Sequence, residues 1–575
     1  MKISGLEIEK FRSIQKCNID LGEINAIVGE NNAGKTAILR ALNSVFNYEF
    51  EEKYFMDQTH KYGPRSNTKI TVHIADIPDD KYVDYVYEGR IKLIFTYNYN
   101  TNKRILYIGN NENNTVMVNE EFIKLLKKDI DYVYIPASRG NRDLTWTDNS
   151  IFKRLISVYA SNYTQNRDSI SGKVVSAADF LQKNILSKIE NQISTLNMQN
   201  ENINYQIGYE NNIDYTIFLS KLGISVSESG KTFSIKECGS GIKSLTVIAL
   251  HRALAQIENT NIVLGIEEPE TNLHPQAQKK LVSSLKNHRE HYEVQTIFAT
   301  HSTVIIDALN HEDIILVRRV EDSIRGFKSK VSQLKQDFWC RYGIEEFQHY
   351  SFFKYRNSDF FFAKYIVLVE STTDAQVFEK MISPMIGDKI YSVSILNLNG
   401  IGYLKYPYYL LRDLEIPFSM VVDKDFFVPY LNDSLDNSRN QDNWLPEYSR
   451  QLNSNCIIDS IFSTDVLKAE LTRKLQESYS KLFTYIRKYK IYPMQYCLEM
   501  DLTCSEKARE KYYQMLNMLP NSHNQKALLK DKKKAIKKAE YILKILEEIE
   551  QRSYPISYKK IRNALIEDIN QAVSE

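Results

Sequence analysis

Hydrophobic and polar residues alternate at the start of the chain, and longer apolar runs follow. The stretch 1–11, MKISGLEIEKF, has the two-residue period of a half-buried strand. In 24–42, INAIVGENNAGKTAILRAL, an apolar run leads through a glycine-containing loop into a helical pattern. The runs NIVLGIE and VQTIFAT, at 261–267 and 294–300, have the length of buried strands. These patterns predict an α/β fold for the first half of the chain.

A second set of such patterns begins near residue 361, after an aromatic and polar stretch of weak periodicity that we interpret as a linker over 331–360. A helix is predicted from near Thr373, directly after the first apolar run. We therefore divide the chain into a first domain over 1–330 and a second α/β domain, with helical additions, over 361–575. Three buried-type strands are predicted in the second domain, within FFAKYIVLVE (361–370), YSVSILNLNG (391–400) and FSMVVDKDFF (418–427).

Composition narrows the class of protein only moderately. A chain of 575 residues is too long for one core and predicts two to four domains. Hydrophobic content of 43%, charged content of 25% and a net charge of +2 are ordinary for a globular protein and neither favour nor exclude a nucleic-acid partner. No run of 18 apolar residues is present, so we expect no membrane span. The six cysteines have no zinc or CxxC spacing, which indicates reduced thiols in a cytoplasmic protein.

The loop in 24–42 carries the most specific motif of the chain. It matches G-x-x-x-x-G-K-[ST] between a predicted strand and a predicted helix, which is the context that a phosphate-binding loop requires. Its backbone N–H groups and the helix N-terminus face the phosphates of ATP. Lys35 is predicted to reach the β- and γ-phosphates, and the Thr36 hydroxyl to bind Mg²⁺. The remaining nucleotide-binding positions that we assign to this loop are Gly29, Asn32 and Gly34.

Two further apolar runs end in residues that suit a nucleotide site. The run at 261–267 ends in Glu267, and Glu268 follows it directly. In P-loop ATPases the first acid after such a strand holds Mg²⁺ through water, and the second polarises the attacking water. Glu268 is therefore the predicted general base. The run at 294–300 is followed by His301, where a histidine can contact the γ-phosphate. An acidic turn and a packing histidine are the structural alternatives.

Gly239-Ser240-Gly241 precede a helical run and form a second candidate anion-binding turn. Together with the opening IEKFRSI, the phosphate loop, EEPE..LHP and ATHS, this order of motifs resembles the ABC-type ATPases of the RecF, SMC and OLD group. The resemblance implies a head-to-head ATPase dimer in which Ser240 and Gly241 complete the partner's site. A dimer is the minimum that it implies, and a tetramer rests on analogy alone.

The stretch between these motifs excludes one class of relative. About two hundred residues separate Gly29 from Gly239, and they show no sustained heptad pattern, so no long coiled-coil arm is expected. We predict helices within about 150–235 that serve as a dimerisation or lid insertion or simply pack on the ATPase core. YIPASRGNRD (134–143) resembles a segment of OLD-like ATPases, in which Arg139 would contact nucleotide or the partner; a surface arginine is the alternative.

In the second domain, acids follow the predicted strands. Glu370 follows the first strand, Asp374 lies one helical turn further on, and Asp423 and Asp425 follow the third strand. Solvated charges at a strand end would look the same in sequence. The order strand–acid–helix, strand–glycine, strand–DxD nevertheless resembles the Toprim domain of topoisomerases, primases and OLD nucleases. Carboxyl ends of parallel strands meet at one sheet edge, where these four acids could bind one or two Mg²⁺ or Mn²⁺ ions and cleave a phosphodiester.

An ABC-type ATPase followed by a Toprim domain resembles the OLD family of nucleases, including the Gabija nuclease and retron-associated relatives in antiphage defence. Two positions depart from that family's pattern: Ser371 stands where most Toprim domains have glycine, and Leu467 where we expect a further acid. Asp465 and Glu470 are the nearby candidates for a second metal site. The family also uses a late lysine, for which KALLKDKKKAIKKAE offers seven, with Lys533 or Lys534 as our candidates; a solvated helix face or contact with DNA phosphates are both open.

These observations predict an ATP-regulated, divalent-metal-dependent DNA endonuclease of the OLD type. The resemblance also implies an accessory partner, such as a helicase or a reverse transcriptase with its DNA product. A second hypothesis is a RecF-like repair or scaffold ATPase whose Toprim domain binds DNA without cutting it. A third, a topoisomerase, requires a transesterifying tyrosine domain, and no companion domain of that kind is recognisable.

Overall fold

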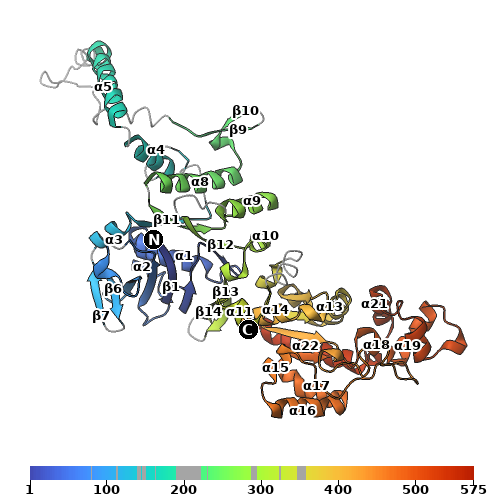
Figure 1. The fold of residues 1–575 in the computed structure, drawn as a ribbon. Helices are drawn as coiled ribbons and strands as arrows, with labels where there is room; N and C mark the ends of the chain where they lie inside the picture. The colour runs from blue at the N-terminus through green and yellow to red at the C-terminus, as the bar shows by residue number, and fades with distance from the viewer. Residues whose placement is uncertain are drawn as a thin grey trace. The chain divides into compact units, whose positions relative to one another are not determined.

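The structure is a computed structural model, and it divides into two compact units. One unit comprises Met1–Ile27 and Gly34–Ala308, and the other Val28–Ala33 and Leu309–Glu575. Each unit is described by itself below (Figure 1). The residues that the structure describes are 1–78, 81–111, 114–118, 120–138, 144–145, 150–161, 164–189, 222–228, 231–258, 260–286, 294–322, 326–345 and 358–574.

The first unit contains two sets of hydrogen-bonded strands. The antiparallel set has the order β7-β6-β5-β4-β1-β2. The other set has the order β3-β12-β11-β8, and β12, β11 and β8 run parallel to one another. The alternation seen at 1–11 forms β1, whereas the continuous apolar runs form β11 and β12, which are buried on both faces. The bounds are β1 Lys2–Phe11, β2 Ile14–Asp20, β3 Ile24–Val28, β4 Thr68–Ala75, β5 Ile91–Asn98, β6 Lys103–Asn111, β7 Asn114–Val118, β8 Ile130–Ile135, β11 Asn261–Glu267 and β12 Val294–Thr300.

Helices of the first unit cover and extend these strands. Helix α1 (Lys35–Phe46) begins directly after the phosphate loop and contacts β8, β12 and β11 with a mostly buried face. Helices α8 (Ser240–Glu258) and α9 (Pro275–Lys286) follow the glycine–serine turn and the acidic strand. The predicted insertion contributes helices α4 (Ile151–Ser161) and α5 (Thr164–Leu181) and a hairpin of β9 (Ser225–Glu228) with β10 (Lys231–Ser234). Its residues 190–221 lie outside the described part of the chain.

The second unit is built around a four-stranded parallel sheet of order β16-β15-β17-β18. Its strands are β15 (Tyr365–Val369), β16 (Val393–Asn397), β17 (Phe418–Val422) and β18 (Ile491–Pro493). An antiparallel hairpin of β13 (Ile314–Asp322) and β14 (Gly326–Gln333) precedes them. In the segment expected as a linker, the structure forms the end of β14 and helix α11 (Phe338–Tyr342).

Helices pack on this sheet and close its core. Helix α13 (Thr372–Ile386) starts at Ser371, whose hydroxyl accepts a hydrogen bond from the Asp374 N–H, while the Asp374 carboxylate accepts one from the Ser371 N–H. Helix α13 contacts α21 (Ala539–Glu548) and the C-terminal α22 (Ile556–Ser574), as Figure 1 shows. The shared core includes Val367, Val369, Phe378, Ile545, Ile561 and Leu565.

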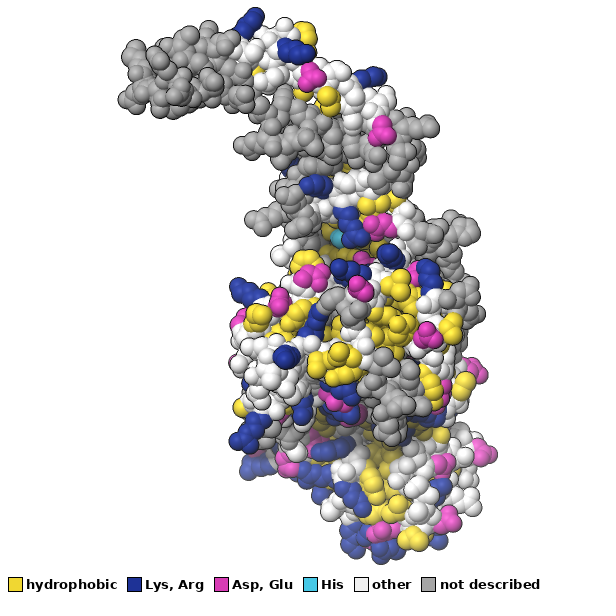
Figure 2. Space-filling model, turned by 90° about the vertical axis from the view of Figure 1, so that its left-hand side faces the viewer, with side chains coloured by type: hydrophobic (Ala, Val, Ile, Leu, Met, Phe, Trp, Pro, Cys, Tyr) yellow, Lys and Arg dark blue, Asp and Glu magenta, His cyan; other side chains and the backbone are white. Residues whose placement is uncertain are grey.

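Charge and hydrophobicity are distributed as the composition suggests. On the face drawn in Figure 2, lysine and arginine side chains are interspersed with aspartate and glutamate. Within the described residues, no helix combines the length and apolar character needed to cross a bilayer.

A glycine in β11 gives a test of the first unit's packing. A Cβ atom added to Gly265 would lie 1.9 Å from the Tyr132 hydroxyl oxygen on the neighbouring β8, and that hydroxyl donates to the Leu39 carbonyl on α1 over 2.9 Å. We expect Gly265→Ala to lower the free energy of unfolding by about 1–3 kcal/mol, because the sheet must shift or lose this bond. Chemical denaturation measures the change. The control is Gly172→Ala in α5, whose added Cβ meets nothing within 4 Å and which should cause no loss.

Candidate functional site

The phosphate loop has the backbone that its glycines predicted. Gly29 has φ of 154° and Gly34 of 110°, and Asn32 adopts φ of 60°, a left-handed conformation that asparagine tolerates. A Cβ atom on Gly29 would lie 1.9 Å from the Val317 carbonyl oxygen, so only glycine fits there. Gly34 is the residue that precedes α1, which places the helix N-terminus at the end of the loop.

Three predicted nucleotide-site residues of the first unit lie near one another. Burial and the charge of Lys35 both lower the pKa of His301, and the charge of Glu268 raises it, which shows that His301 faces both groups. Glu268 follows β11 with a φ of 41°, and its carboxylate accepts a hydrogen bond from the Thr271 hydroxyl over 3.2 Å. A strained conformation of this kind at a strand end is characteristic of functional positions. Thr36 occupies the first turn of α1, next to Lys35.

Glu267 lies against a second group of polar side chains. Its Oε2 atom accepts a hydrogen bond from the Ala137 N–H over 3.3 Å. Burial and then the Glu267 charge raise the pKa of Tyr134, and the charges of Arg40 and Arg12 lie close to these two residues. Arg12 and Tyr134 belong to the IEKFRSI and YIPASRGNRD motifs, so both motifs meet at the acid expected to hold Mg²⁺. Arg139 of the second motif lies outside the described residues.

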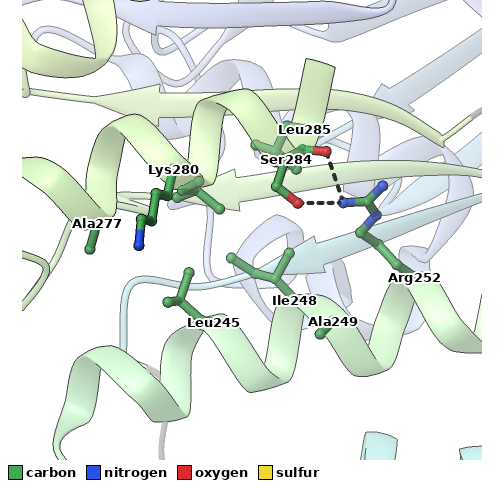
Figure 3. Close-up of a pocket in the computed structure, with 9 residues that line it drawn as sticks. Leu245, Ile248, Ala249, Arg252, Ala277, Lys280, Ser284 and Leu285 are labelled. Atoms are coloured by element: carbon green, nitrogen blue, oxygen red, sulfur yellow. Dashed lines mark hydrogen bonds between the residues drawn. The ribbon is translucent and has the colours of Figure 1, made fainter. Parts of the chain in front are cut away.

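The glycine–serine turn packs on the loop that follows the acidic strand. A Cβ atom on Gly241 would lie 2.7 Å from the Asn272 carbonyl oxygen, so the start of α8 closely approaches the turn after Glu268. Ser240 is exposed at the first position of α8. Further along, α8 and α9 enclose a groove of about 330 Å³ (Figure 3). Its lining is mainly aliphatic, and Arg252 at its edge donates to the Ser284 carbonyl oxygen over 3.3 Å, so this groove is not a second phosphate site.

In the second unit, the parallel sheet brings four predicted acids to its carboxyl edge. Glu370 follows β15 and Asp423 follows β17, which pair directly, and Asp425 lies in the short turn after Asp423. Asp374 occupies the first turn of α13. Burial is the largest cause of the raised pKa of Asp423, followed by the charges of Asp374, Glu370 and Asp425. The four carboxylates therefore share one desolvated region, as the strand order predicted.

Repulsion between carboxylates also acts at Glu370. Burial, then the charges of Asp425 and Asp374, raise its pKa to about 7, whereas a hydrogen bond from the Ile401 backbone lowers it. That backbone group belongs to the turn at Gly400, whose φ of 121° requires glycine. Burial also raises the pKa of Asp374, although the Ser371 N–H and hydroxyl donate to its carboxylate over 2.8 and 2.7 Å. Ser371 thus has a structural role where the resemblance led us to expect glycine.

The structure adds one acid and one lysine that the sequence analysis missed. The charge of Glu499 contributes to the raised pKa values of Glu370, Asp374 and Asp423, so this carboxylate faces the same cluster. The Lys537 Nζ atom lies 3.0 Å from Glu499 Oε1. Glu499 lies in α18 (Leu498–Thr503), which follows β18 by four residues. Strand β18 has only three residues and ends in proline, so the sequence contains no long apolar run before Glu499 from which this acid could be predicted.

Other predicted residues lie elsewhere. Asp465 is exposed in the first turn of α16 (Asp465–Gln476), and Glu470 lies 3.8 Å from Arg473 and faces Tyr485. Among the described residues, neither acid contributes to the pKa shifts of the carboxylate cluster. Of the two lysine candidates, Lys533 pairs with Asp436 over 2.5 Å and Lys534 is exposed, and among the described residues neither forms an ion pair with an acid of the cluster. The fifth acid of the cluster is instead Glu499 of α18. The lysine that pairs with it is Lys537, three residues beyond Lys534.

The donor set of this cluster fits a hard divalent cation. Several like charges held together in a desolvated site remain protonated or attract a cation, and carboxylate oxygens are the ligands that Mg²⁺ and Mn²⁺ prefer. In the part of the chain that is described, no three such side chains already point at one common position. Binding would therefore require the carboxylates to turn toward the ion. The residues suited to hold it are Glu370, Asp374, Asp423, Asp425 and Glu499.

Comparison with known proteins identifies both domains. Residues 24–307 match the family described as "AAA domain, putative AbiEii toxin, Type IV TA system". Residues 361–425 match the family described as "Overcoming lysogenization defect protein-like, TOPRIM domain". The chain joins an AAA-type ATPase domain to an OLD-like TOPRIM domain.

The chain is similar in sequence to curated proteins over most of their length. The chain is 23% identical to the OLD nuclease of Thermus scotoductus, over 73% of this chain and 81% of the relative. It is 22% identical to the Old nuclease of Escherichia phage P2, over 74% and 78%. It is also 22% identical to the endonuclease GajA of Bacillus cereus VD045, over 74% and 75%. A solved SMC head domain from Thermotoga maritima aligns with a TM-score of 0.32 at 15% identity, over 58% of this chain and all of that domain.

The TOPRIM carboxylates give a pH-dependent prediction. Because the pKa of Glu370 is raised to about 7, an entering ion must displace a proton below that pH, and above it the site is already charged. We expect Mn²⁺ to bind about tenfold more tightly at about pH 8 than at about pH 6, with protons released at the lower pH. Isothermal titration calorimetry in buffers of different ionisation enthalpy measures both quantities.

Two variants sharpen this test. Glu370→Gln should weaken Mn²⁺ binding and flatten its pH dependence, because the titrating ligand is gone. Asp465→Asn, an exposed acid outside the cluster, should bind Mn²⁺ as the unaltered protein does. Equal affinity at both pH values without proton release would show that these carboxylates do not receive the ion.

Proposed function

We propose that the chain is an ATP-regulated, divalent-metal-dependent DNA endonuclease. The observation that carries the proposal is the convergence of Glu370, Asp374, Asp423, Asp425 and Glu499 in one desolvated region of an OLD-like TOPRIM domain. The names of the relatives, OLD nuclease and endonuclease GajA, favour cutting over a scaffold that only binds DNA. No described feature favours the topoisomerase hypothesis over this one.

In this proposal, the carboxylates hold the ion and orient the scissile phosphate. A bound divalent ion lowers the pKa of water and neutralises charge that develops on a phosphodiester. Glu370 and Asp374 face Asp423 and Asp425, so the two strand ends contribute to one site. Lys537 is held in place by Glu499. Its positive charge offsets the repulsion between the five acids and an approaching phosphate. Asp374 also caps α13, which fixes its carboxylate relative to the sheet.

The ATPase domain binds ATP with Mg²⁺ and regulates cutting. Lys35 and Thr36 contact the phosphates and the ion, Glu267 holds the ion through water, and Glu268 accepts the proton of the attacking water. His301 lies beside Lys35 and Glu268, where it would contact the γ-phosphate. A second copy of the chain would complete each nucleotide site through Ser240 and Gly241, and a dimer is the smallest assembly consistent with this role.

We further infer a cytoplasmic role in defence against phage. The relationship to GajA and the free state of all six cysteines support this assignment. An accessory helicase, or a reverse transcriptase with its DNA product, is the kind of partner that the resemblance suggests.

Asp423→Asn tests the nuclease. Nicking of supercoiled plasmid in Mn²⁺ should fall about a hundredfold or more, because the acid on which the charges of the other four carboxylates act can no longer bind the ion. Gel quantification of nicked circles gives the rate. Asp465→Asn is the matched control and should nick at the normal rate. If the Asp423→Asn protein cut as fast as the unaltered chain, the nuclease proposal would fall and the scaffold hypothesis would take its place.

Lys35→Ala tests the regulatory role of ATP. It should abolish ATP binding, because the phosphates lose their buried cation, while leaving the TOPRIM chemistry intact. We expect plasmid nicking by this variant to be the same with and without ATP, whereas nicking by the unaltered protein responds to ATP. Glu268→Gln should retain ATP binding and lose hydrolysis, which separates binding from turnover.

A further inference from the structure

A lysine-rich segment at 526–538 lies alongside the loop at 430–448, which follows Asp423 and Asp425 in the chain. At one end, Lys537 pairs with Glu499 over 3.0 Å. Further back, Lys533 pairs with Asp436, Lys530 Nζ lies 5.3 Å from the centre of the Trp444 ring, and Lys526 donates to the Gln441 carbonyl oxygen. The segment therefore contacts the loop at three positions and Glu499 of α18 at a fourth, and it does not simply face solvent.

That loop starts at the cluster itself. The Tyr430 hydroxyl donates to Asp425 Oδ2 over 3.0 Å, and the Tyr430 ring stacks on Tyr448 with centroids 5.3 Å apart. Lys424, between the two acids of the DxD pair, lies 4.8 Å from the centre of the Tyr448 ring. The loop and the lysine segment thus flank a surface that begins at the metal-binding acids.

Trp444 is held in an unusual conformation on this surface. Its φ of 65° is left-handed, which a bulky side chain adopts only where the surroundings enforce it. The backbone N–H of Trp444 donates a hydrogen bond to the Asn440 carbonyl oxygen over 3.0 Å. The Trp444 carbonyl oxygen accepts one from the Arg439 guanidinium over 2.9 Å. The result is an indole ring placed beneath the Lys530 ammonium group, a cation–π contact that orients the lysine.

Two lysines of the segment keep their charge available. Lys530 and Lys534 are exposed, and among the described residues neither is paired with a carboxylate, unlike Lys533 and Lys537. Unpaired ammonium groups next to a site that cuts phosphodiesters suit phosphate oxygens as ligands. Contacts of this kind carry no base specificity, so they position the strand without selecting its sequence.

We propose that Lys530 and Lys534 bind the phosphodiester backbone of the DNA strand that enters the carboxylate cluster, with Trp444 as the residue that positions Lys530. This proposal rests on the proposed nuclease function. It identifies the surface that would bring the DNA strand to the carboxylate cluster. The bound group is the backbone phosphate on the side of the cluster that the 430–448 loop covers.

The test compares single Lys→Gln variants of the full chain on DNA. For Lys530→Gln and for Lys534→Gln, the slope of log K against log salt concentration should become shallower by about 1, because each variant loses one phosphate contact. The rate of nicking at saturating DNA should stay within about twofold, since neither lysine touches the carboxylates. Fluorescence anisotropy with a labelled duplex, in Ca²⁺ in place of Mn²⁺, measures binding.

Lys488→Gln is the matched control. Lys488 is also exposed and lies 4.9 Å from the centres of the Tyr485 and Tyr489 rings, but it precedes β18 and so lies at the opposite end of that strand from Glu499. Its salt slope should equal that of the unaltered chain. Trp444→Leu should weaken DNA binding, and combining it with Lys530→Gln should add little, since both changes remove the same contact.

The outcomes separate the two proposals. If the unaltered protein fails to nick plasmid, the nuclease function falls. If it nicks plasmid but the salt slopes of Lys530→Gln and Lys534→Gln match that of Lys488→Gln, the nuclease function stands and this surface is not the DNA path. Non-additive loss in the Trp444→Leu/Lys530→Gln pair supports the positioning role, and fully additive loss overturns it.

Discussion

Electrostatic repulsion among buried carboxylates is the constraint on which the second unit depends. Burial, and then the charges of neighbouring acids, raise the pKa values of Glu370, Asp374 and Asp423, and that of Glu370 reaches about 7. A fold does not normally retain such an arrangement for stability, because replacing these acids with apolar groups would remove the repulsion. The parallel strands, the Ser371 cap and the Gly400 turn hold the acids together all the same. A divalent cation is the natural counter-charge.

Both domains use the same geometric device. In each, the candidate functional side chains lie at the carboxyl ends of parallel strands: Glu267 and His301 in the ATPase domain, Glu370 and Asp423 in the TOPRIM domain. Strands buried on both faces leave only their ends for polar chemistry, so the acids gather where the backbone emerges from the core. In the ATPase domain, the glycine at 241 then lets the start of α8 approach the turn that follows β11.

The positions of strands could be predicted wherever an apolar run was long and bounded. Strands β11 and β12 lie in the apolar runs that lead to Glu267 and to His301, and β15 lies within the predicted stretch 361–370. The acids that directly follow such runs were found for the same reason, and the structure brings four of them together. Glu499 was missed because β18 is three residues long and ends in proline. Asp465 and Glu470 were chosen from a local pattern of acids, and only the structure showed that Asp465 is exposed and that Glu470 lies beside Arg473.

The sequence by itself determined the motifs whose residues lie close together in the chain: the phosphate loop, the acid pair after β11, and the DxD pair after β17. Each depends on residues a few positions apart, so short-range backbone geometry defines it. The tertiary structure alone decided which distant residues complete each site. Glu499 lies 76 residues and Lys537 114 residues beyond Asp423, and only the order of strands in the sheet and the packing of the C-terminal helices bring them to it.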